Sequence, residues 1–127
     1  MFQNLEVFQI SQAMAQHAGR SQAMISQNVA NADTPGYVPM RLPDFKASYA
    51  PDASDLQKAT RPEHLHGAVD AGSVRPVELR DHASPDGNAV SVEREMLASV
   101  DAVRQHDRAL QIYKSALTVL HATLGRR

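Results

Sequence analysis

Two histidines in alternate positions are the first side chains here whose spacing could bind a metal ion. On a strand, His64 and His66 would face the same way, with Glu63 beside them. A protein metal site needs three or four ligands, and the other candidates follow without defined spacing: Asp70, Asp81 and His82. We predict no metal site and interpret these histidines as solvated loop side chains; a His-dependent metalloprotein is the alternative.

Catalytic patterns are equally sparse. A hydrolase needs a nucleophile, a base and an orienting group held by a rigid core. The sequence contains no cysteine, which excludes a thiol nucleophile and a thiolate zinc site. It also shows no nucleophile elbow, no paired-carboxylate pattern and no phosphate-binding glycine-rich loop. We therefore predict that the protein is not an enzyme and carries no cofactor.

The composition fits one modest domain with little core of its own. The chain has 127 residues, 43% of them hydrophobic but only 5% aromatic, and it lacks tryptophan. A formal net charge of -1 does not favour nucleic-acid binding, and no apolar run reaches the roughly 20 residues of a membrane span. We expect helices that complete the burial of their apolar faces on a partner.

Proline divides the chain into three parts, because all seven prolines lie between residues 35 and 85. The first flank, about residues 4–31, has apolar residues at helical spacing, and its stripe includes Leu5, Phe8, Ile25 and Val29. The last flank, about residues 91–124, repeats every seven residues through Met96, Val103, Leu110, Leu117 and Leu124. Such a repeat predicts a left-handed supercoil with a partner, with Tyr113 and Leu120 at intervening positions.

The predicted fold is mainly α-helical. Residues 1–36 form a helix and turn, residues 37–90 an irregular proline-rich segment with at most a small β-hairpin, and residues 91–127 a second helix. We expect the two helices to pack as an antiparallel, coiled-coil-like pair and to form one core domain.

The most specific stretch is residues 28–37, NVANADTPGY. Pro35 presets the first central position of a turn, and Gly36 permits the positive φ of a type II turn. Asp33 and Thr34 can make local hydrogen bonds, and Tyr37 follows as an aromatic anchor. Two further polar residues, Asn28 and Asn31, could cap carbonyls at the helix end or bind the backbone of a neighbouring subunit.

This string at the end of an amino-terminal helix resembles the signature of the bacterial flagellar rod and hook family of axial proteins. Further features are similar to the short proximal-rod member of that family. They are Asp44 and Phe45 after the turn, and Asp86, Gly87 and Asn88 before a helix that contains Glu93, Glu95 and Met96. The resemblance covers both flanks and is poor in the middle.

The resemblance implies a structural subunit of the basal-body rod, an axial tube built from terminal helices that transmits torque and serves as an export channel. It also implies type III export without a cleaved signal and assembly in the periplasm. The implied partners are copies of this chain, other rod proteins, and proteins of the membrane ring and export gate. Each helix pair would pack on neighbouring subunits by heterologous contacts that do not close into a ring.

A second class of function explains the heptad repeat equally well. A cytosolic coiled-coil adaptor or export chaperone would use the same apolar row to bind a client helix. That alternative leaves the turn at residues 28–37 unexplained.

Overall fold

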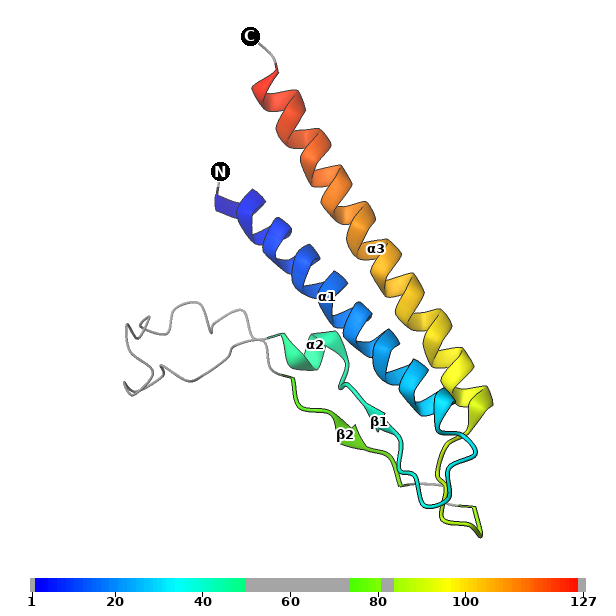
Figure 1. The fold of residues 1–127 in the computed structure, drawn as a ribbon. Coiled ribbons are helices and arrows are strands. Elements are labelled where there is room, and N and C mark those ends of the chain that lie inside the picture. The colour runs from blue at the N-terminus through cyan, green and yellow to red at the C-terminus, as the bar shows by residue number, and fades with distance from the viewer. Residues whose placement is uncertain (1, 50–73, 81–83, 126–127) are drawn as a thin grey trace, which may run out of the picture.

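The computed structural model describes residues 2–49, 74–80 and 84–125, and its two long helices dominate the fold (Figure 1). Helix α1 spans Phe2–Ala30 and helix α3 spans Val92–Leu124. They lie side by side and run in opposite directions, so the start of α1 and the end of α3 lie at one end of the pair (Figure 1). The predicted, mainly helical fold is confirmed, and the helix bounds differ from the expected ones by at most two residues.

The described part of the connection between the helices contains three short elements. Strand β1, Met40–Arg41, pairs antiparallel with strand β2, Val77–Glu78, and the helix α2, Phe45–Ser48, follows β1. Met40 lies opposite Glu78, so the two strands come from distant parts of the sequence and do not form a tight hairpin. Both strands lie near the end of the helix pair at which α1 ends and α3 begins (Figure 1).

The contact between α1 and α3 is made mainly by small and polar side chains. A hydrogen bond of 2.9 Å joins Gln22 Nε2 to Ser99 Oγ across it, and the rings of Phe8 and Tyr113 meet edge to face at 5.2 Å. One set of buried positions recurs every seven residues on each helix, as in a coiled coil. It consists of Ser11, Ala18 and Ile25 on α1, and Glu95, Ala102 and Ala109 on α3; His17 and Asn28 of α1 are also buried, outside this spacing. We call the seven-residue row the α1–α3 seam.

The predicted heptad row of α3 does not form this seam. Met96, Val103 and Leu110 are 61%, 49% and 40% exposed, and Leu124 is exposed as well, whereas Leu117 and Leu120 are half-buried. Successive helix residues are about 100° apart, so a row that begins at Met96 lies a quarter turn away from one that begins at Glu95. The row that begins at Glu95 has the same seven-residue spacing. It is less evident in the sequence because Ala102 and Ala109 are small.

The described side chains of the predicted α1 stripe differ in burial. Ile25 is buried and Phe8 is half-buried, but Val29 is exposed because the preceding residue, Asn28, takes the inward position. Leu5 belongs to α1, and its side chain lies outside the described residues. Neither long helix, within the residues that the structure describes, has a stretch apolar enough to cross a membrane.

Candidate functional site

Residues 31–37 form a tight turn at the end of α1. The N–H of Tyr37 donates to the carbonyl of Thr34 at 3.3 Å, and Gly36 has a φ of 73°. This hydrogen bond and a positive φ at the third turn position match the predicted type II turn. The Asn31 amide donates to the Gln27 carbonyl at 2.8 Å and so caps the helix, while its oxygen accepts the Thr34 hydroxyl at 3.3 Å.

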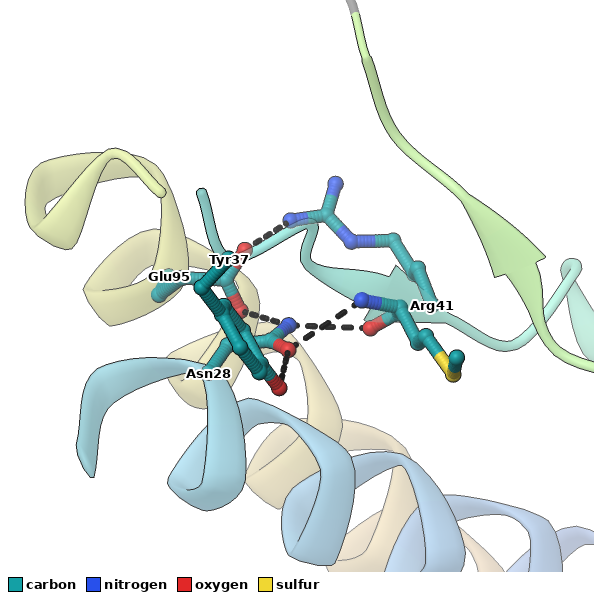
Figure 2. Close-up of polar contacts among 5 residues, drawn as sticks. Asn28, Tyr37, Arg41 and Glu95 are labelled. Carbon is teal, nitrogen blue, oxygen red and sulfur yellow. Dashed lines mark hydrogen bonds and ion pairs between the residues drawn. The ribbon is translucent and has the colours of Figure 1, made fainter. Parts of the chain in front are cut away.

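Asn28, in the last turn of α1, is 1% exposed and uses both ends of its amide (Figure 2). Its Nδ2 donates to the Met40 carbonyl at 2.9 Å and to Glu95 Oε2 at 3.1 Å. Its Oδ1 accepts the Met40 N–H at 3.1 Å and the Tyr37 hydroxyl at 3.3 Å. Since an amide offers two donors and two acceptor lone pairs, all four positions are filled.

Glu95, in the first turns of α3, completes this polar cluster. Its side chain is 3% exposed, and its Oε1 accepts a hydrogen bond of 2.9 Å from an Arg41 Nη atom (Figure 2). The buried carboxylate therefore bonds a cationic group from β1 and an amide from α1, which offsets its loss of solvation. We call Asn28, Tyr37, Met40, Arg41 and Glu95 the Asn28 cluster.

A second set of contacts holds the turn against the start of α3. Asn88 is 4% exposed, and its Nδ2 lies within 3.2 Å of three carbonyl oxygens, those of Asn31, Ala32 and Thr34. Its Oδ1 accepts the Val90 N–H at 2.7 Å. The three carbonyls belong to the turn that follows α1, so the Asn88 side chain joins this turn to the segment before α3.

The backbone of the two glycine turns meets beside Asn88. The Gly36 N–H donates to the Asp86 carbonyl at 3.2 Å, and the Ala89 N–H donates to the Tyr37 carbonyl at 3.0 Å. A Cβ built on Gly87, whose φ is 80°, would lie 3.4 Å from the Gly36 Cα. Both glycines therefore have a positive φ, and they allow the two turns to approach closely.

This arrangement positions chain segments, since the polar atoms of the Asn28 cluster bond mainly to one another. The described residues include no group of three or more His, Cys, Asp or Glu that could hold a metal ion. The predicted loop histidines, His64 and His66, lie outside the described residues.

The comparisons with known proteins agree with the motif. A family model described as "Flagella basal body rod protein" matches residues 11–37, which include Asn28 and the turn. The chain is 24% identical over 129 residues to the flagellar basal body rod protein FlgB of Agrobacterium fabrum, with 98% of this chain and 96% of the relative covered. It is 28% identical over 122 residues to FlgB of Buchnera aphidicola, with 88% and 89% covered.

Over most of its length the chain is therefore similar to flagellar basal body rod proteins. This similarity supports a structural role in the flagellar basal body, in motility and in assembly with other rod components. The relatives belong to a structural family and not to a known enzyme family.

The structure brings part of the predicted turn set together. Asn28 and Tyr37 meet in the Asn28 cluster, and Asn31, Thr34 and Gly36 form the turn beside it, whereas the side chains of Asp33 and Pro35 are exposed. The role of these residues in rod assembly stays a prediction.

Sequence reasoning missed the residues that bind this turn from elsewhere in the chain. In the sequence, Glu95 and Asn88 stand out only as parts of the stretches that resemble the rod family, and nothing marks Arg41. One signal was available for Glu95: it precedes Ala102 and Ala109 at seven-residue spacing, so a charge begins an otherwise small, buried row. No local pattern marks Arg41 or Asn88, because their partners lie more than 50 residues away.

Proposed function

We propose that this chain is a subunit of the proximal segment of the flagellar rod and that it assembles through α1 and α3. The single observation that carries this proposal is the exposed apolar row on α3. Monomeric proteins rarely expose long apolar surfaces without a binding role. Exposed members of the row and its neighbours are Met96, Leu97, Val100, Val103, Leu110 and Leu124.

The small α1–α3 seam explains why this row is available. Because alanine and serine fill much of the contact between the helices, the larger apolar side chains of α3 are not needed there. Their burial against neighbouring copies or other rod proteins would supply hydrophobic free energy that the isolated chain lacks. The helix-packing residues that the sequence predicts on α3 are therefore proposed as contacts between subunits.

The proposed roles in torque transmission and export rest on similarity to the two FlgB proteins and on assembly through α1 and α3. A tube of such subunits would transmit torque and leave an axial channel for exported proteins. The chain would reach the periplasm through the flagellar export apparatus without a cleaved signal. Its partners below the rod would be proteins of the membrane ring and the export gate.

Deletion and complementation of the gene test this function. Cells without the gene should not swim in soft agar, and their purified basal bodies should show the membrane ring without a rod. The wild-type gene should restore both properties. Normal basal bodies in the deletion strain, without a second flagellar system, would contradict the proposal and favour a cytosolic adaptor that binds a client helix.

A further inference from the structure

We infer that the Asn28 cluster sets the register of α1 against α3, and that the apolar contacts of the seam do not. This inference concerns the folded chain itself and stands or falls independently of the proposed rod function. Its physical basis is the repetitive character of the α1–α3 seam.

Apart from the Gln22–Ser99 hydrogen bond and the Phe8–Tyr113 ring contact, the contact between the helices offers little information about register. The buried positions of the seam repeat every seven residues on both helices, and most of them are alanine or serine. A shift of one heptad, about 10 Å along the axis, would again place small side chains against small side chains. Packing alone therefore discriminates weakly between the observed register and a shifted one.

The Asn28 cluster does not repeat in this way. If α3 moved by one heptad toward its amino terminus, Ala102 would replace Glu95 opposite Asn28. An alanine cannot accept the Asn28 Nδ2 hydrogen bond, and the Glu95 carboxylate would lose Asn28 and the Arg41 guanidinium together. In the observed register Asn28 and Glu95 are almost fully buried, so these bonds form away from water, where hydrogen bonds are electrostatically stronger. A single buried polar contact can specify register in coiled coils in the same manner.

Cross-linking of paired cysteines measures the register directly, because the natural chain contains no cysteine. Gln22→Cys with Ser99→Cys reports the observed register, since these two side chains are in contact. Gln22→Cys with His106→Cys reports a shift of one heptad. A thiol-specific cross-linker that spans less than about 10 Å, the length of one heptad, is applied to the purified full-length chain. The yields of intramolecular product are then compared.

In the otherwise natural chain, we expect the 22–99 yield to exceed the 22–106 yield at least about tenfold. Glu95→Ala should reduce this ratio several-fold. Asn88→Ala is the matched control, because Asn88 binds the turn at the end of α1 without joining the seam; it should leave the ratio unchanged. An unchanged ratio in Glu95→Ala, or a larger change in Asn88→Ala, would overturn the inference.

A second variant keeps the test decisive if Glu95→Ala fails to fold. Asn28→Leu combined with Glu95→Met replaces the buried polar pair with apolar side chains, a change that often preserves or raises stability. Arg41 is 39% exposed in its side chain and can turn into solvent. We expect this double variant to keep its helical circular dichroism and to give both cross-links. Helical protein that gives the 22–99 product alone would contradict the role of the cluster.

Discussion

The amide of Asn28 donates a 3.1 Å hydrogen bond to the carboxylate of Glu95, and both side chains are almost fully buried. This bond joins the last turns of α1 to the first turns of α3, across 67 residues of sequence. Asn28 also bonds Tyr37 and both backbone groups of Met40, so one side chain connects both helices, the turn and β1.

Asn28→Ala should lower the free energy of unfolding by about 1–3 kcal/mol, because it leaves the buried Glu95 Oε2 and the part-buried Met40 carbonyl without this partner. Urea unfolding followed by circular dichroism measures the change. Asn31→Ala serves as the control, since the Asn31 amide makes an exposed bond that water can replace. Equal decreases in the free energy of unfolding would show that the Asn28 bonds stabilise the fold no more than the exposed Asn31 bond does.

Gly36→Val should lower the free energy of unfolding by about 1–3 kcal/mol, because a β-branched residue is strained at a φ of 73°. A Cβ at this position would meet no heavy atom within 4 Å, so the cost comes from backbone conformation and not from a clash. Gly36→Asn should cost clearly less, because asparagine tolerates positive φ better. If valine and asparagine give the same stability, the proposed strain is absent.

Gly19→Ala should raise the stability by about 0.5–1 kcal/mol. Gly19 lies inside α1, where alanine is the better helix former, and a built Cβ has no neighbour within 4 Å. Thermal and urea unfolding of the purified chain test this. If the variant is stable but fails to restore swimming, the space beside Gly19 is needed for contact with another subunit.

Much of the fold follows from local information in the sequence. The absence of proline outside residues 35–85 and the helical spacing of apolar residues predict both long helices, and Pro35 with Gly36 predicts the turn. These features depend on neighbouring residues only. Local sterics and hydrogen bonding are therefore sufficient to specify them.

The face of α3 that packs against α1 could not be predicted from the same signals. The row through Met96 is more hydrophobic than the row through Glu95, so a reading based on hydrophobicity selects the wrong face as the contact with α1. Buried bonds of Glu95 reverse this preference, and they depend on Asn28 and Arg41, which are distant in the sequence. The seven-residue periodicity is the same in both rows. Only the tertiary partners determine which of the two rows packs against α1.

We propose that α3 presents an apolar row for assembly that the folded chain itself does not need. Leu110→Asp is the sharpest test of this proposal, because Leu110 is 40% exposed and belongs to the predicted heptad row. Gln111→Asp, an exposed polar position next along α3, is the matched control. Each variant replaces the natural gene, and rods are counted in purified basal bodies.

We predict that Leu110→Asp leaves the helix content and unfolding midpoint of the purified chain nearly unchanged and abolishes rods and swimming, whereas Gln111→Asp supports both. Normal rods with Leu110→Asp would contradict the claim that this row is an assembly surface. Loss of the folded state in Leu110→Asp would contradict the claim that the chain folds without burying it.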